Sequence, residues 1–180
     1  AVSVSKRMGI VDVLDADEMR DYMNANLSNS NVASYVSLLG KSDTNWQDLI
    51  YRESFSTDNS FSARANLFGS IPFRASVGYT KSEGVVKTND LERYTASIKL
   101  SPVLLDNHLK IDFNAKGISS KKNAIDEGGV IGGALAMDPT KPAYDNSPSN
   151  IFGGYYQSLS SNNSIDGQSN PLALLNQRTR

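Results

Sequence analysis

The sequence predicts an all-β protein, built as an antiparallel β-meander with short helices in its connections. Four successive segments, 61–67, 73–80, 94–100 and 109–116, alternate apolar and polar side chains with a period of two, which is typical of strands with one apolar face. The connections between these segments are alternately short and longer, as a meander of antiparallel neighbours requires. Helical spacing is confined to short stretches before and after them.

The composition excludes several classes of protein. The chain has 180 residues, a net charge of −1, 39% hydrophobic residues, 25 Ser, 17 Asn and no Cys. Without cysteine there is no disulfide scaffold and no thiolate metal site. The balanced charge argues against nucleic-acid binding, which requires a basic surface. No apolar run reaches the roughly 18 residues of a membrane helix, but the strands of a membrane barrel escape that test because their apolar residues alternate with polar ones.

The segment before the alternation predicts a strand end and two helices. Residues 1–9 alternate loosely and predict the end of a strand. Asp15 and Glu18 have the spacing of a capping box, which predicts that a helix begins there. Residues 24–31 are rich in Asn and Ser and predict a loop. A second short helix is predicted at 46–51, entered through Asp43 or Thr44.

The alternating segments have one apolar face and one charged face. The apolar positions are Phe61, Ala63, Leu67, Phe73, Val77, Tyr79, Tyr94, Ile98, Leu100, Ile111 and Phe113. The opposite face carries Arg64, Arg74, Lys99, Lys110, Asp112 and Lys116. A barrel with lipid outside and water inside requires this division along every strand, but a soluble sheet with one wet face shows it too. Periodicity alone therefore leaves both architectures open.

The alternation ends at 122, and the remaining residues predict a long irregular excursion. A Gly-rich segment at 124–137 predicts a short helix, and Asn170 is placed to cap a final helical turn at 171–175. Three aromatic residues, Phe152, Tyr155 and Tyr156, lie in the excursion beside Asn and Ser. Such a combination suits contact with sugars or peptides. The alternative, which we favour, is that the rings anchor the loop to the rest of the structure.

The residue types offer no catalytic or metal site. His108 is the single histidine and lies in a predicted turn, without a second histidine or a cysteine at metal-ligand spacing. Asp126 and Glu127 are adjacent carboxylates, but neighbours on a chain point apart. We therefore expect no enzymatic activity and no cofactor.

Short motifs follow one another along most of the chain. They read VLDADE at 13–18, NWQD at 45–48, EGVVK at 83–87, LERYT at 91–95, LLDNHLKI at 104–111, DPTKP at 138–142 and NPLALL at 170–175. In type and order they resemble segments of the SusC/RagA-type TonB-dependent outer-membrane transporters of Bacteroidetes-like bacteria. The segment GSIPF at 69–73 departs from the family pattern, and nothing resembles the family's plug or TonB box.

The resemblance implies that the chain is a piece of a large transmembrane β-barrel in the bacterial outer membrane. Transporters of this kind have about 22 strands around a plugged lumen, so 180 residues supply a minor part of one. Residues 1–122 would form the first strands with helical insertions, and 123–180 an extracellular excursion and return. The apolar face would meet lipid, and the charged face would border the plug or the water-filled lumen.

The implied function is TonB-dependent import of nutrient oligomers, with glycans preferred over peptides as cargo. The implied partners are a SusD-like surface lipoprotein, TonB acting through the plug, the remainder of the barrel, outer-membrane lipid, and an oligosaccharide or peptide substrate. An alternative from another class is a soluble, surface-exposed β-rich module that binds carbohydrate without transport.

Overall fold

A computed structural model of the chain describes residues 1–7, 9–28, 30–106, 108–160, 162 and 164–176. Its elements occur in the order β1 (Val2–Ser5), α1 (Ala16–Ala25), α2 (Ser30–Val36), α3 (Trp46–Ile50), β2 (Ser54–Leu67), β3 (Ile71–Glu83), β4 (Asp90–Leu100), β5 (Val103–Leu104), β6 (Leu109–Lys110), β7 (Phe113–Asn123), α4 (Glu127–Ala136) and α5 (Pro171–Asn176). Of the excursion expected over 123–180, residues 161, 163 and 177–180 lie outside the described residues.

The chain forms two compact units that do not follow its linear order. The first unit comprises Ala1–Ser5, Glu53–Gly84 and Asn89–Ala124. The second comprises Lys6–Arg52, Val85–Thr88 and Ile125–Arg180. The helices that precede the meander therefore belong to the same unit as the excursion that follows it.

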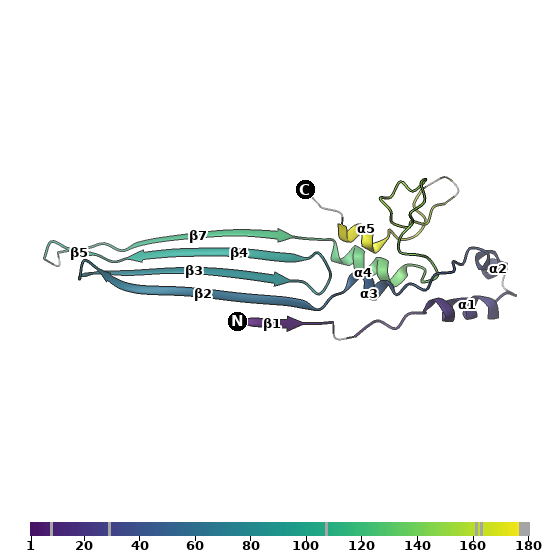
Figure 1. The fold of residues 1–180 in the computed structure, drawn as a ribbon, viewed down its shortest axis with the longest axis horizontal. Coiled ribbons are helices and arrows are strands. Elements are labelled where there is room, and N and C mark those ends of the chain that lie inside the picture. The colour runs from purple at the N-terminus through teal and green to yellow at the C-terminus, as the bar shows by residue number, and fades with distance from the viewer. Residues whose placement is uncertain (8, 29, 107, 161, 163, 177–180) are drawn as a thin grey trace. The chain divides into compact units, whose positions relative to one another are not determined.

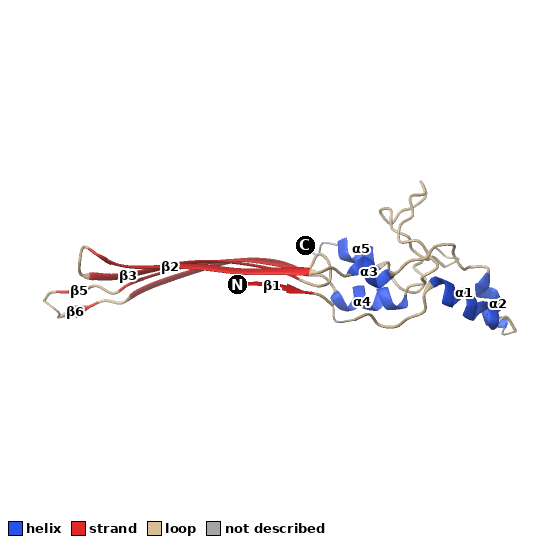
Figure 2. Ribbon diagram, turned by 60° about the horizontal axis from the view of Figure 1, so that its bottom comes forward, coloured by secondary structure: helices blue, strands red, loops and turns tan. Residues whose placement is uncertain are grey.

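The first unit contains a five-stranded antiparallel sheet in the order β1-β2-β3-β4-β7. Figure 1 shows β2, β3, β4 and β7 side by side as a meander, and Figure 2 shows the strands as a single layer. The prediction of an antiparallel meander is confirmed. The strands β2, β3, β4 and β7 have 14, 13, 11 and 11 residues. They are longer than the segments that predict them, because the ladder continues through stretches such as 54–60 in which the apolar alternation is interrupted.

The pairing register runs without a bulge across the sheet, so residues opposite each other share a face. The apolar face consists of four consecutive rows: Ala65–Phe73–Leu100–Phe113, Ala63–Ala75–Ile98–Ala115, Phe61–Val77–Ala96–Gly117 and Asn59–Tyr79–Tyr94–Ser119. The opposite face contains the rows Arg64–Arg74–Lys99–Asn114 and Ser62–Ser76–Ser97–Lys116. The apolar and the polar side chains thus lie on opposite faces of the sheet, as their alternation in the sequence predicts.

The segment predicted as one strand over 109–116 is divided in the structure, which corrects that expectation. β6 ends at Lys110 and β7 begins at Phe113, so neither Lys110 nor Asp112 lies in the five-stranded sheet. The physical reason is Pro102, which faces Ile111 and has no N–H to donate to the ladder. Its carbonyl still accepts a hydrogen bond from the Ile111 amide at 3.0 Å.

Beyond that break, β5 and β6 resume the register of the longer hairpin. Val103 pairs with Lys110 and Leu104 with Leu109, which is the spacing that extrapolation of the β4–β7 pairs requires. Lys110 and Asp112 therefore keep the alternation of β7, although the strand itself is interrupted.

The buried core lies in the second unit. Its hydrophobic cluster consists of Trp46, Ile50, Val86, Val130, Ala134, Met137, Leu172 and Leu175, contributed by α3, α4, α5 and the 85–88 turn. Every buried hydrophobic residue of the described chain belongs to this unit. The apolar side chains of the sheet are therefore not gathered into a core of their own.

The helices are close to the predicted ones, with two differences. α3 begins after Asn45 and not after Asp43 or Thr44, because the Asn45 side chain accepts a hydrogen bond from the Asp48 amide at 3.2 Å. α2 begins at Ser30, inside the predicted loop at 24–31, although its residues have low helix propensity. The capping box of α1 is confirmed. So is the Asn170 cap of α5, which accepts from the Leu172 amide at 2.9 Å.

Candidate functional site

The apolar face of the sheet is exposed in the described chain. The exposed fractions of Phe61, Val77, Ile98 and Phe113 are 70%, 57%, 44% and 52%. Contiguous apolar surface of this kind on a protein marks a site that meets another apolar phase or partner. The described strands of the first unit form no second sheet on this face, so it is not the inner face of a closed sandwich within that unit.

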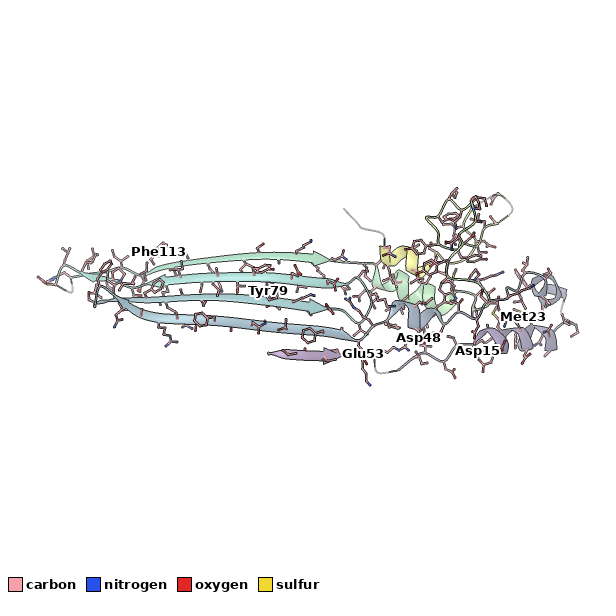
Figure 3. The ribbon with its side chains drawn as sticks, viewed as in Figure 1. Asp15, Met23, Asp48, Glu53, Tyr79 and Phe113 are labelled. Carbon is pink, nitrogen blue, oxygen red and sulfur yellow. The ribbon has the colours of Figure 1, made fainter. Side chains whose placement is uncertain are left out.

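Aromatic rings stand at both ends of the apolar rows. Tyr79 and Tyr94 are directly opposite each other on β3 and β4, with ring centroids 5.0 Å apart. Beyond this pair, the next row on the same face is charged: Thr57, Lys81, Glu92 and Lys121. At the other end, Phe73 and Phe113 lie in the row with Leu100. Figure 3 labels Tyr79 and Phe113 along the meander.

The opposite face carries the charged residues that the sequence singles out. Arg64, Arg74 and Lys99 form one cross-strand row and border a hollow of about 500 Å³ that Ser101 also lines. All three side chains are exposed, and none forms an ion pair with a carboxylate of the described residues. Like charges opposite one another on a sheet repel, so this row is suited to a wet environment or to an anionic neighbour.

Hydroxyl contacts link strands on the same polar face. The hydroxyls of Ser76 and Ser97 are 2.7 Å apart, and those of Ser56 and Ser82 are 3.1 Å apart. Thr80 donates to the Asp58 carboxylate at 2.8 Å. Lys116 lies in the row of Ser76 and Ser97, one row from the cations. Most of this face is therefore polar, although it also carries Leu91 and Ile118.

The loop aromatics divide into anchors and one partly exposed ring. Tyr155 and Tyr156 pack against the core of the second unit, and burial raises the pKa of Tyr156. The Tyr155 ring lies 5.6 Å from that of Tyr144, and its hydroxyl accepts a hydrogen bond from Asn176 at 2.6 Å. Phe152 lines a hollow of about 380 Å³ together with Tyr155 and Gln157. These contacts favour the anchoring interpretation for the two tyrosines.

The turn that precedes these rings is held by Asp145. Hydrogen bonds from the Ser147 amide, at 2.9 Å, from the Ser147 hydroxyl and from Asn150 lower the pKa of the Asp145 carboxyl. Because the carboxylate form is the one favoured, the contribution of these bonds to stability is present above the ordinary carboxyl pKa. It is lost as the pH falls through the lowered value.

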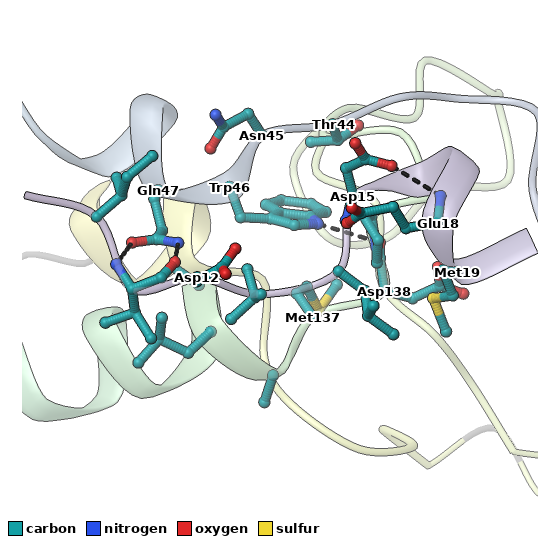
Figure 4. A pocket seen from close by; sticks show the side chains of 18 of the residues that line it. Asp12, Asp15, Glu18, Met19, Thr44, Asn45, Trp46, Gln47, Met137 and Asp138 are labelled. Carbon is teal, nitrogen blue, oxygen red and sulfur yellow. Dashed lines mark hydrogen bonds between the residues drawn. The ribbon is translucent and has the colours of Figure 1, made fainter. Parts of the chain in front are cut away.

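A hollow of about 1050 Å³ lies in the second unit, between segments 10–19, 43–47 and 134–139. Figure 4 shows Trp46 and Gln47 in its wall. Trp46 donates from Nε1 to the Asp138 carbonyl at 3.1 Å. Gln47, 5% exposed, uses both ends of its amide on the backbone of Val11, at 2.8 and 3.0 Å. Sequence analysis missed this role of Gln47, because its backbone partner lies 36 residues away.

Three carboxylates of this hollow, those of Asp15, Glu18 and Asp138, serve local structure. Asp15 accepts from the amides of Asp17 and Glu18, and Glu18 accepts from the Asp15 amide. Asp138 accepts from the amide and the hydroxyl of Thr140. Each of these three side chains is therefore committed to holding a helix start or a turn.

The described residues offer neither a metal-binding cluster nor a helix that could span a membrane. No group of three or more His, Asp or Glu side chains with a geometry that could hold a metal ion occurs among the described residues. His108 is exposed, with Nδ1 2.8 Å from the Leu105 carbonyl. In the part of the chain that the structure describes, no helix is long and apolar enough to cross a membrane.

Comparison with known proteins finds one similar protein along nearly the whole chain. Over 172 residues the chain is 43% identical to a protein of Bacteroides thetaiotaomicron, "TonB-dependent receptor SusC". The match covers 95% of this chain and 16% of that receptor's length. No family model matches the chain.

Proposed function

We propose a function for this chain from its similarity to a SusC-type TonB-dependent receptor, which extends along 95% of the chain. We infer that the chain forms part of the wall of an outer-membrane transport barrel. The observation that carries this proposal is the exposed apolar face of the sheet. An apolar face on a single layer, backed by a charged face, fits a strand wall between lipid and water.

The dimensions of the apolar face support the same proposal. From Tyr94 on β4 to Leu104 on β5 there are ten residue steps, which correspond to about 34 Å along an antiparallel strand. With the usual tilt of about 40°, that distance spans about 26 Å of height, close to the apolar band of about 25 Å in outer-membrane barrels. The Tyr79–Tyr94 pair would then belong to the aromatic girdle at one interface.

The charged face is proposed to border the aqueous interior or the plug. Its residues are Arg64, Arg74, Lys99, Lys110, Asp112 and Lys116. The row of unpaired cations supports this assignment, because three such charges facing hydrocarbon would each carry a large desolvation cost. The hydroxyls of Ser76 and Ser97, in the row next to these cations, would replace water at the wall for a polar cargo.

The proposed activity of the whole receptor is import of nutrient oligomers across the bacterial outer membrane, driven through TonB. Glycans are the preferred cargo class and peptides the other one. The proposed partners are a SusD-like surface lipoprotein, TonB acting through the plug, the remaining strands of the barrel and outer-membrane lipid. Residues 123–180 are proposed as an extracellular excursion, in which Phe152 faces the lid or the cargo while Tyr155 and Tyr156 anchor the loop to the core.

Growth experiments test this activity. The gene for the receptor that contains these residues is deleted in its host, and growth is compared on digests of polysaccharide and of protein as sole nutrient. We expect growth on polysaccharide digests to fail, to return with the intact gene, and to fail again without TonB. Uptake that persists without TonB would contradict the proposed mechanism, and loss confined to protein digests would assign peptides as the cargo.

A further inference from the structure

Two turns at the same end of the meander carry bulky apolar side chains that are fully or largely exposed. Phe68, between β2 and β3, is 95% exposed, and Leu105, after β5, is 72% exposed. Both turns lie at the ends of the strands farthest from the Tyr79–Tyr94 pair. A turn in water ordinarily carries polar residues, glycine or proline.

The backbone conformation at these two positions also disfavours bulky side chains. Phe68 and Leu105 have φ of 52° and 53°, in the left-handed region that a bulky side chain disfavours. Phe68 is followed by Gly69 at φ 80°, and the Ser70 amide donates to the Leu67 carbonyl at 3.2 Å. Asn followed by Gly is the favoured pair for two left-handed turn positions. Turn chemistry therefore does not account for phenylalanine here.

The apolar face continues into both turns. Leu67 pairs with Ile71 immediately before the first turn, and Leu104 pairs with Leu109 before the second. The exposed fractions of Leu67, Leu104 and Leu109 are 38%, 42% and 42%. At the opposite end, the same face changes to the charged row of Lys81 and Glu92 directly after the tyrosine pair. The two ends of the face are thus built differently.

We propose that Phe68 and Leu105 insert into the lipid bilayer and anchor the turn end of the meander at the boundary between headgroups and acyl chains. This inference rests on the proposed function, because it needs the apolar face to meet lipid. Continuity with that face is the reason to choose lipid as the occupant. The adjacent Ser70 and Asp106 are polar, which suits a position at the boundary and not deeper in the hydrocarbon.

Site-directed fluorescence in the complete receptor tests the proposal. The described segment has no cysteine, so single cysteines for an environment-sensitive fluorophore are introduced by Phe68→Cys and Leu105→Cys, after replacement of any cysteine elsewhere by serine. The labelled receptors are reconstituted in phosphatidylcholine vesicles, with and without lipids brominated near the headgroup or near the chain end. We expect labels at 68 and 105 to be quenched more by the shallow bromines than by the deep ones.

Two control positions separate this inference from the proposed function. A label at Ile98→Cys, near the middle of the apolar band, is expected to be quenched most by deep bromines, and one at Ser97→Cys, on the opposite face, is expected to be little affected. Quenching at 98 without quenching at 68 and 105 would overturn the anchor and leave the barrel intact. No quenching at 98 would overturn both proposals.

A second pair of variants tests the proposal even if the labelled receptors fail to assemble. Phe68→Asn and Leu105→Asn suit left-handed turns better than the natural residues, so assembly in detergent should be preserved. We expect the double variant to insert into vesicles more slowly, by roughly twofold or more, because the apolar contact with lipid is lost. An unchanged insertion rate would contradict the proposal.

Discussion

Ile98 and Ser97 are neighbours on β4 whose side chains point to opposite faces of the sheet. We predict that Ile98→Arg in the complete receptor lowers the free energy of unfolding by about 2–4 kcal/mol, because it places a charge near the middle of the apolar band. Reversible urea unfolding of the receptor in lipid or detergent measures this difference.

Ser97→Arg is the matched control at the adjacent position. It removes the hydroxyl contact with Ser76, at 2.7 Å, which is worth about 1 kcal/mol, but its charge reaches the face proposed to be wet. Equal losses from the two substitutions would refute the assignment of the faces. One pair of variants at adjacent residues therefore tests which face of the sheet meets lipid.

Some residue roles are readable from local sequence, and others are not. Asp15 and Glu18 act within three positions of their own place in the chain, so spacing alone predicts their hydrogen bonds. The cap that Asn170 forms on Leu172 is equally local, but the Asn170 side chain also donates to the carbonyls of Ala143 and Tyr156, 27 and 14 residues away. Gln47 binds the backbone of Val11, and Trp46 the carbonyl of Asp138, 36 and 92 residues away. No local pattern reports such partners, because chain folding brings them together.

At the scale of the element, helix α1 depends on its capping box. We predict that Asp15→Ala destabilises the helix by about 1 kcal/mol, since it removes the acceptor for the amides of Asp17 and Glu18. Hydrogen exchange of the amides in Ala16–Ala25 measures the change in the complete receptor.

Asp17→Ala is the control for that helix, because Asp17 is an equally acidic first-turn residue without a capping role. It loses an exposed ion pair with Arg20, at 2.7 Å, which contributes about 0.3–0.5 kcal/mol. If the amide exchange rate rises by the same factor in both variants, the negative charge, and not the cap, stabilises the start of the helix.

Strand boundaries show where periodicity stops being informative. β2 extends back to Ser54 and β7 on to Asn123, through stretches dominated by Ser, Asn, Asp and Lys. The ladder hydrogen bonds join backbones, so a strand continues where its neighbour offers partners even when the alternation of side chains is lost. The break before β7 has the opposite cause, since Pro102 withdraws a donor where the apolar pattern is unchanged.

At the scale of the molecule, the two architectures left open by the alternation predict different solution behaviour. We predict that residues 1–180, produced alone, aggregate in buffer without detergent. The apolar face is exposed, and β1 and β7 each have a single pairing partner among the described strands, so surface and edges both invite association. Size-exclusion chromatography with light scattering, with and without detergent, measures the state.

A variant with serine at Phe61, Val77 and Ile98 is the control for this experiment, and it should aggregate less if the apolar face is responsible. A monodisperse, cooperatively melting monomer of the natural sequence in plain buffer would instead favour the soluble carbohydrate-binding module. The solution behaviour of the two proteins thus distinguishes a piece of a transport barrel from a soluble binding domain, and the experiment does not require the cargo to be known.

The sequence by itself determined the antiparallel meander, the division of side chains between its faces, the helix starts at Asp15 and Asn170, and the kinship with SusC-type receptors. Each of these depends on residues close together in the chain or on motifs in order. Only the tertiary structure decided that segments 6–52 and 125–180 form one unit with the buried core, and that the sheet keeps its apolar face uncovered. Burial depends on which distant segments meet, and the alternation that specifies an apolar face is the same whether protein or lipid covers it.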